Sequence, residues 1–526
     1  MNRLFLDFFT LIPAAVVLSS LLPLKSYAQK ESSYIIESIN IHRSNVFPGK
    51  PDELNGIEKF ANKLHTITKE KVIERELLFV IGDTLDIELV TETERRLRTF
   101  DFLGIADINI DTIDQQFVRI KVYTEDQWSL IPSYIIESGG GLIGLGASIE
   151  ESNLFGYGKS VYFEGYNESD VGTTWSFAYY DPRLFGSKYK SALGLSSGPL
   201  NETFYLSVYM PYFYSDSKWT YGVDFLIDDE IQRLFYDGKE FSRLLLERTS
   251  IKGDVGYAFG ERYKKKRLKL KYKYIDRNFI SLGDATNSPV PDDEIIATTS
   301  VGFSIESQRF TKETHIDQFQ RIEDITLGRK SGITIGKAGF PIPVGVNRWE
   351  ISTYHSHAFE FPHHQYLFGG ASFSSWIEKN TILSLSSQYY WHASKLFTIA
   401  INVNFDYTWD LEEHRQFVLG GDSGLRGYKA REFGGDKYFL ANLEGRFFPS
   451  LELMNIELGT ILFVDSGYAW RRFESLDIQD LRYSTGFGFR FAFLKAPGET
   501  VARLDFGWPI NQTGGMQVTF GIGQHF

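Results

Sequence analysis

The 526-residue sequence contains no cysteine and, beyond its first residues, no continuous apolar run long enough to form a membrane helix. The lack of cysteine excludes a disulfide framework, which a chain of this length does not need. A membrane helix needs about 20 consecutive apolar residues, so no such helix is expected after the N-terminus. The formal net charge of −12 also argues against a nucleic-acid partner, which would require a basic face.

The N-terminal segment has the features of a secretory signal peptide over residues 1–28. Arg3 precedes an apolar run over residues 8–24, and residues 26–28, Ser-Tyr-Ala, form a small-residue cleavage site. The alternative is a single uncleaved anchor helix. We expect the rest of the chain to be exported.

A mixed pattern of strands and helices follows, over residues 29–128. The expected order is strand, helix, helix, strand, strand, at residues 34–42, 69–79, 87–100, 105–110 and 117–123. Thr68 is a plausible N-cap for the first helix, and residues 47–65 look like an insertion that contains a further helix. This order is typical of a small soluble α+β domain.

The sequence pattern changes in residues 129–526. There, short stretches of alternating apolar and polar residues are separated by clusters of Gly, Pro, Asn and Asp. We count about 16 or 17 stretches, ambiguous around residues 368–392, and expect a transmembrane antiparallel β-barrel of 16 strands. Closing a barrel leaves no unpaired sheet edge. Aromatic residues make up 16% of the chain and recur near strand ends, as at residues 389–391 and Trp409, where rings suit the headgroup level of a membrane.

The last nine residues, VTFGIGQHF, alternate as a final barrel strand would. Val518, Phe520, Ile522 and Phe526 share one face of this strand. A last strand that ends on an aromatic residue resembles the signal by which bacterial outer-membrane barrels are recognised for assembly.

The segment LGGDSGLRGY, residues 419–428, contains the Gly-Asp-Ser-Gly string that surrounds the nucleophile of chymotrypsin-like proteases. A serine nucleophile requires a positioned base, and nothing marks the nearby His414 as a partner of Ser423. The protein is therefore not expected to be an enzyme. His355, His357, His363 and His364 make a metal site geometrically possible, although such histidines are more often lumen or interface residues, so we expect no metal and no other cofactor.

Leu425, Arg426, Gly427 and Tyr428, preceded by Gly420 and Gly421, resemble the Val-Arg-Gly-Phe/Tyr signature of BamA/TamA-type outer-membrane assembly factors, the bacterial surface antigen type, and of two-partner-secretion translocators. Further sequence motifs of that superfamily are matched by residues 153–156, 181–186 and 463–467. The resemblance implies a 16-stranded barrel in the bacterial outer membrane and polypeptide-transport-associated (POTRA) domains in the periplasm, of which residues 29–128 look like one.

The resemblance also implies roles for individual residues. The signature loop would fold into the barrel, where Arg426 would pair with Asp465 on the inner wall. Partners would be outer-membrane lipids, unfolded outer-membrane or secreted polypeptide clients, and accessory assembly proteins. Clients would add as strands to a sheet edge such as that of Phe117–Tyr123.

For an insertase, the gate would be the seam between the first and last barrel strands, which we expect at Leu142–Glu150 and Val518–Phe526. Gly144 and Gly146 on one side and Gly521 and Gly523 on the other would weaken this pairing. The competing interpretation is a passive outer-membrane channel or uptake porin. One soluble domain is fewer than these families usually carry.

Overall fold

The structure is a computed structural model that describes most of the chain. The described residues are 34–50, 52–139, 141–282, 290–316, 319, 322–377, 379–412, 414–494, 501–510 and 514–526. The predicted signal peptide at residues 1–28 lies outside them. Within these ranges, no helix has the length and apolar content needed to span a membrane.

The N-terminal α+β unit is built on a three-stranded sheet. Its strands are β1 (Ile35–Ser44), β2 (Leu103–Thr112) and β3 (Phe117–Asp126), in the order β1-β3-β2. The connection between β1 and β3 includes α3 (Glu70–Glu74) and α4 (Ile87–Arg98). These elements confirm the predicted order, although α3 is shorter than the expected helix over residues 69–79.

The core of this unit forms between the sheet and α4. Strand β3 alternates buried and half-buried residues, and its buried members Val118, Ile120 and Val122 meet Leu97 of α4 and Ile36 of β1 in one cluster. This is the pattern of a sheet with one covered face. The cluster therefore holds α4 in a fixed place on the sheet.

Local capping differs from the prediction at one helix. Thr68 does not cap α3: the capping position is Lys69, without a side-chain hydrogen bond, and the Thr68 hydroxyl donates to Asp126 Oδ2 at 3.0 Å. The predicted helix within residues 47–65 is α2 (Gly56–Leu64), where the Asn55 side chain accepts hydrogen bonds from Ile57 and Glu58 in a capping box.

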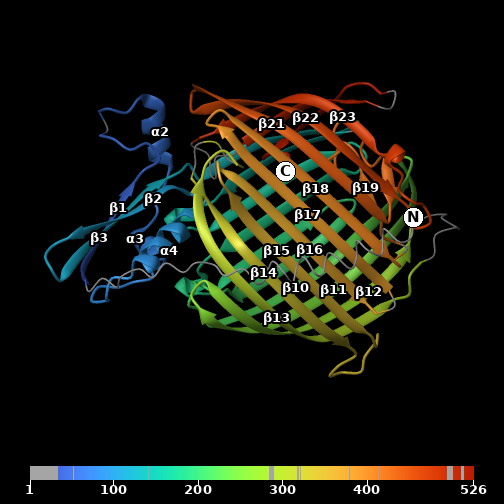
Figure 1. Cartoon of the computed structure of the whole chain (residues 1–526), viewed down its shortest axis with the longest axis horizontal. Helices are drawn as coiled ribbons and strands as arrows, with labels where there is room; N and C mark the ends of the chain where they lie inside the picture. The colour runs from blue at the N-terminus through green and yellow to red at the C-terminus, as the bar shows by residue number, and fades with distance from the viewer. Residues whose placement is uncertain are drawn as a thin grey trace.

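The remainder of the chain forms a closed antiparallel barrel, so the predicted fold class is confirmed. Its strands are β4 (Leu130–Gly139), β5 (Leu142–Glu151), β6 (Ser160–Glu168), β7 (Gly172–Asp181), β8 (Lys190–Ser197), β9 (Asn201–Met210), β10 (Trp219–Tyr236), β11 (Lys239–Glu261), β12 (Lys264–Ser281), β13 (Glu294–Glu313), β14 (Glu323–Ala338), β15 (Trp349–Phe361), β16 (Gln365–Trp376), β17 (Lys379–Ser394), β18 (Phe397–Trp409), β21 (Lys437–Leu453), β22 (Ile456–Trp470), β23 (Arg482–Phe493), β24 (Val501–Pro509) and β25 (Gln517–Ile522). Figure 1 shows the α+β unit, in blue, against one end of this barrel.

The predicted number of 16 strands was wrong, because the described residues form a ring of 20. The strand pattern is weak in each segment, and period-2 alternation runs on through tight turns. The ambiguous stretch at residues 368–392, for example, belongs to two strands, β16 and β17, that pair with each other across a short turn.

Strand β22 shows how side chains alternate between the outer and the inner face of the barrel wall. Leu462 and Val464 are exposed on the outside, whereas Ile461, Phe463 and Asp465 are buried on the inside. Because successive side chains of a strand point to opposite faces, one face is apolar toward lipid and the other carries the polar lumen.

Candidate functional site

The loop between β18 and β21 folds into the barrel and carries the signature residues. Its ends pair as a short hairpin, β19 (Phe417–Leu419) with β20 (Phe433–Gly435). Gly420 and Gly421 follow β19, and the Gly421 N–H donates to the Lys429 carbonyl, which closes the turn. The loop is thus tied together at its base before it reaches the lumen.

The signature side chains pack against the barrel wall. Leu425 and Tyr428 are buried with Leu419, Leu440 and Ala469 in one apolar cluster. The Tyr428 hydroxyl also donates to the Tyr483 carbonyl at 3.0 Å. These contacts fix the loop as part of the lumen interior.

Gly427 lies directly against the backbone of β24. Its φ is +91°, and a Cβ at this position would stand 3.0 Å from the carbonyl carbon of Trp508. A larger residue would therefore be strained in its backbone and would push the loop away from the wall.

Arg426 is the centre of the site and is fully buried. Its Nε and Nη2 donate to the two carboxylate oxygens of Asp465 at 2.9 and 2.8 Å, a bidentate pair. Its Nη1 donates to Glu444 at 2.7 Å and to Asp505 at 3.2 Å. The guanidinium also lies 3.5 Å from the ring centre of Phe463. One loop side chain thereby joins β21, β22 and β24.

Two further arginines extend this network along the inner wall. Arg446 donates to Glu444 at 2.9 Å, and Arg490 donates to Asp505 at 2.6 Å. Because charges in an enclosed lumen are weakly screened, each acid and each arginine needs its partner. Burial alone would lower the pKa of Arg426, but the three carboxylates hold it above its ordinary value, so the residue stays charged.

The chain end completes the network. Strand β25 ends at Ile522, and Gly523, with φ of +82°, turns the last residues into the lumen. There Arg446 donates to the backbone oxygen of Phe526 at 2.9 Å, and Arg503 donates to the Gln524 carbonyl at 2.8 Å. Two arginines of the inner wall thus also hold residues 524 and 526 in place.

This arrangement corrects the expectation for the C-terminal strand. Phe526 does not share the outer face with Val518, Phe520 and Ile522: its ring packs inside, against the cluster that contains Tyr366 and Tyr390. The reason is the turn at Gly523, which ends the alternation. His525 is half-buried, and its Nε2 lies 3.3 Å from the Gly424 carbonyl oxygen. Burial and the charge of Arg426 hold its pKa well below the ordinary value, so the imidazole is neutral at neutral pH.

The seam of the barrel lies elsewhere than predicted. The first barrel strand is β4, not residues 142–150, and it pairs with β25 through a single described residue pair, Phe520 with Ser138. By contrast, β4 and β5 are paired along ten residues. The predicted strand was therefore the second one, because Pro132 obscures the strand pattern of β4 in the sequence.

Only some of the glycines predicted at the seam lie on the strands that form it. Gly144 and Gly146 lie on β5, away from the closing pair, where Cβ atoms would collide with Tyr166 of β6 and its neighbouring backbone. Gly521 lies on β25, and a Cβ there would stand 3.0 Å from the Arg503 guanidinium. The β5 glycines therefore do not lie at the seam, where β25 pairs with β24 at six positions but with β4 at one described pair.

Comparison with known proteins identifies the part of the chain that contains this site. Residues 367–526 match the model of the Omp85 superfamily domain. The chain carries an Omp85 superfamily domain. The matched range contains the plugging loop, Asp465 and β25, so the superfamily inferred from the signature is confirmed.

Comparison with curated proteins found no match. Similar solved structures include BamA from Haemophilus ducreyi lacking POTRA domains 1-3, at 14% identity over 93% of this chain and 84% of that chain, with a TM-score of 0.40. CdiB from Acinetobacter baumannii matches at 11% identity over 94% of this chain and 74% of that chain, with a TM-score of 0.48. CdiB from Escherichia coli matches at 11% identity over 96% and 92%, with a TM-score of 0.45.

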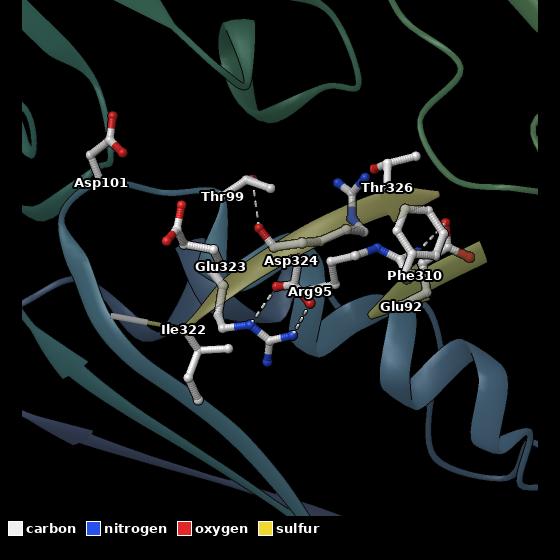
Figure 2. A pocket seen from close by; sticks show the side chains of 11 residues that line it. Glu92, Arg95, Thr99, Asp101, Phe310, Ile322, Glu323, Asp324 and Thr326 are labelled. Atoms are coloured by element: carbon white, nitrogen blue, oxygen red, sulfur yellow. Dashed lines mark hydrogen bonds and ion pairs between the residues drawn. The ribbon is translucent and has the colours of Figure 1, made fainter. Parts of the chain in front are cut away.

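The α+β unit contacts the barrel through charged side chains. Arg98 of α4 forms a bidentate pair with Asp324 of β14, at 2.7 and 2.8 Å. Asp324 lines a cavity of about 430 Å³. Arg95 and Phe310 also line this cavity (Figure 2), and the Arg95 guanidinium lies 3.5 Å from the ring centre of Phe310. The contact is polar, as is usual for interfaces between domains of one chain.

Two turns of the barrel, whose sequences resemble motifs of the superfamily, also contact the α+β unit. In the first, the Asn153 side chain donates to the Thr68 hydroxyl at 2.8 Å. In the second, Arg183 pairs with Glu76 and donates to the Arg75 carbonyl. Residues 153–156 and 181–186 therefore hold the α+β unit, a contact that their sequence pattern alone did not reveal.

The protease and metal interpretations find no support in these contacts. The Ser423 hydroxyl is 3.4 Å from Asp422 of its own turn, while His414 packs against Phe279. His355 hydrogen-bonds to Ser331 at 2.7 Å, and His357 stacks on Phe359. A search of the described ranges found no group of three or more His, Cys, Asp or Glu side chains able to hold a metal ion.

Sequence reasoning brought Arg426 and Asp465 together, but it missed most of the network. Glu444, Arg446, Arg490, Arg503 and Asp505 were not singled out. A usable signal was present: in segments such as Asn442-Leu443-Glu444-Gly445-Arg446, polar residues recur at every second position, which places them together on the lumen face.

Proposed function

We propose that the protein assists the insertion or the translocation of polypeptides at the outer membrane, without covalent catalysis and without a cofactor. The observation that carries this proposal is the combination of a loop held inside the lumen by Arg426 with a wall whose first and last strands are joined by one described residue pair. A plugged barrel with one weak wall contact is suited to opening for a chain rather than to steady conduction.

The α+β unit would act as a POTRA-like periplasmic domain that receives unfolded clients. Phe117–Tyr123 cannot be the docking edge, because β3 is the central strand and pairs with both β1 and β2. We assign this role to the outer edge of β2, where Ile105 is exposed. An added strand would gain main-chain hydrogen bonds with little demand on client sequence.

A path from that edge to the barrel supports this assignment. A cavity of about 640 Å³ is lined by Ile105 and Ala106 of β2, by Lys312 of β13, and by Asn455 and Leu494 at the barrel end. A client strand on β2 would therefore extend along the barrel rim. Gating would then involve the β4/β25 seam and the Arg426 loop, with lipids and accessory assembly proteins as further partners.

The second candidate is a passive channel or uptake porin, favoured by the charged lumen wall. Purified protein in planar bilayers separates the two functions. Rare, fluctuating openings, together with catalysed assembly of an unfolded client barrel in liposomes, are expected for the proposed function. Stable, large, ohmic openings without client assembly would establish the channel instead.

A further inference from the structure

Helix α2, Gly56–Leu64, exposes its apolar side chains and packs its polar ones. Ile57, Phe60 and Leu64 are 80%, 63% and 56% exposed, and no residue of the helix is buried. The packed side carries Asn62, whose side chain donates to the Phe47 carbonyl at 2.8 Å and accepts from the Phe47 N–H at 3.1 Å. In a water-facing helix the reverse is expected.

The three apolar residues form one continuous face. Their spacing of three and four positions places them on the same side of an α-helix. Lys59 and Lys63 are also exposed and, being four positions apart, lie together along one side of this face. An apolar stripe bordered by lysines is the composition of a helix that lies in a membrane interface, where the long lysine side chains reach the headgroups.

The C-terminal end of α2 is held where the barrel wall begins. The cap residue His65 hydrogen-bonds through Nε2 to Asp126 at 2.8 Å and through Nδ1 to Ser129 at 3.3 Å. Strand β4 starts at the next residue, Leu130. Figure 1 shows α2 beside the same end of the barrel.

The outer surface of β4 indicates where lipid begins. Leu130, Tyr134 and Ile136 are exposed on this strand, with Tyr134 at 85%. Exposed aromatic and aliphatic residues on the outside of a barrel strand face the membrane. The tether at Ser129 therefore places α2 at the level of the headgroups, next to the strand that closes the barrel.

A groove beside α2 matches the charge of phospholipid. It measures about 530 Å³, and its charged lining residues, Arg43, Lys59 and Lys63, are all cationic. Phe47 and Leu54 supply apolar lining. Cations above an apolar surface suit a phosphodiester headgroup with its acyl chains.

We infer that α2 is an interfacial helix that inserts Ile57, Phe60 and Leu64 into the periplasm-facing leaflet beside the β4/β25 seam, with Arg43, Lys59 and Lys63 on phospholipid phosphates. This goes beyond the proposed function, since it concerns how the α+β unit is attached to the membrane. It holds for an insertase and for a channel alike.

The test uses full-length protein reconstituted in vesicles of phosphatidylethanolamine and phosphatidylglycerol. Because the chain lacks cysteine, Phe60→Cys provides a single labelling site for an environment-sensitive fluorophore. Ile113→Cys is the matched control: it is exposed in the β2–β3 turn, about 30 Å from the barrel end of β2 at the rise of a strand.

We expect blue-shifted emission at position 60, quenching by phospholipids that carry a spin label on the acyl chain, and protection from iodide. The control should show the opposite pattern, and Ile57→Cys should repeat the result of Phe60→Cys. Lys59→Glu with Lys63→Glu should remove any dependence on phosphatidylglycerol content. Equal iodide quenching at positions 60 and 113 would overturn the inference, and so would protection from iodide without quenching by lipid, which indicates a protein contact.

Discussion

The guanidinium of Arg426 and the carboxylate of Asp465 form a bidentate ion pair inside the barrel, with neither side chain reached by solvent. A loop residue is thereby fixed to β22, and the same guanidinium contacts Glu444 and Asp505 on the neighbouring wall. Displacing the loop would leave Asp465 without its cation, whereas Glu444 and Asp505 would keep Arg446 and Arg490 as partners. The plug is therefore removed only at a considerable free-energy cost, or when other charges replace it.

Replacing Arg426 by Ala should leave a folded barrel that is markedly less stable. Removal of one partner from a buried ionic network typically costs about 3–5 kcal/mol. Arg426→Lys keeps the charge but loses the fork that contacts both Asp465 oxygens, so its loss should be smaller. The unfolding midpoint and the frequency of single-channel openings measure both effects.

The matched control is Arg472→Ala, since Arg472 pairs with Asp410 at the surface, where 45% and 54% of the two side chains are exposed. Exposed pairs contribute about 0–1 kcal/mol, so this variant should behave like the unmodified protein. Equal behaviour of Arg426→Ala and Arg472→Ala would show that the plug does not depend on the lumen pair.

Extending the chain by two glycines after Phe526 should reduce the yield of folded barrel. The added residues would displace the Phe526 backbone oxygen from Arg446, which donates to it at 2.9 Å, and would require space beside the buried side chains of the lumen. The yield can be read from the heat-modifiable band after refolding into detergent. The same two glycines inserted after Phe473, which is 95% exposed, are the control and should be tolerated. A normal yield for the C-terminal extension would contradict a structural role of the chain end.

How far the sequence predicts this fold depends on the kind of pattern. The α+β unit was predictable because its elements differ in period and are separated by polar turns, as in β2 and β3. The barrel class was predictable from repeated alternation, but strand number was not, because alternation has no intrinsic start or end. That ambiguity hid β4 and shifted the predicted seam by one strand.

The residues of the site were predictable only where they belong to a recognised sequence motif. Arg426 and Asp465 followed from the signature and its partner strand, whereas Arg490 and Asp505 meet through packing of separate strands that no local pattern reveals. The inward turn of Phe526 depends on one positive φ at Gly523. A single glycine in a strand does not by itself specify a reversal of direction.

Breaking the contact between Arg98 and Asp324 should loosen the α+β unit from the barrel. Both side chains are largely shielded, at 9% and 16% exposed, and hydrogen bonds between charged groups contribute about 1.5–3 kcal/mol. A double-mutant cycle with Arg98→Ala and Asp324→Ala should give a coupling in that range. Amide hydrogen exchange in α4 is the measurement, and exchange should increase with ionic strength.

The exposed pair of Arg309 and Glu360 is the control for that cycle, with 56% and 32% of the side chains exposed. Its coupling should lie below about 1 kcal/mol. If the two cycles gave the same small value, the α+β unit would be held mainly by other contacts, such as Asn153 with Thr68.

Locking the seam should stop client insertion while leaving the barrel folded. Ser138→Cys with Phe520→Cys places two cysteines at the one described pair between β4 and β25, and the chain has no other cysteine. Directly paired residues of antiparallel strands have Cα atoms about 4.5–5.5 Å apart, which a disulfide can bridge. The lipid-facing pair of Tyr134→Cys with Ala147→Cys joins β4 to β5 and is the matched control. Client assembly in liposomes should fall to background in the oxidised seam variant, return with reductant, and persist in the control. Undiminished assembly by the locked seam would mean that clients leave the barrel by another route.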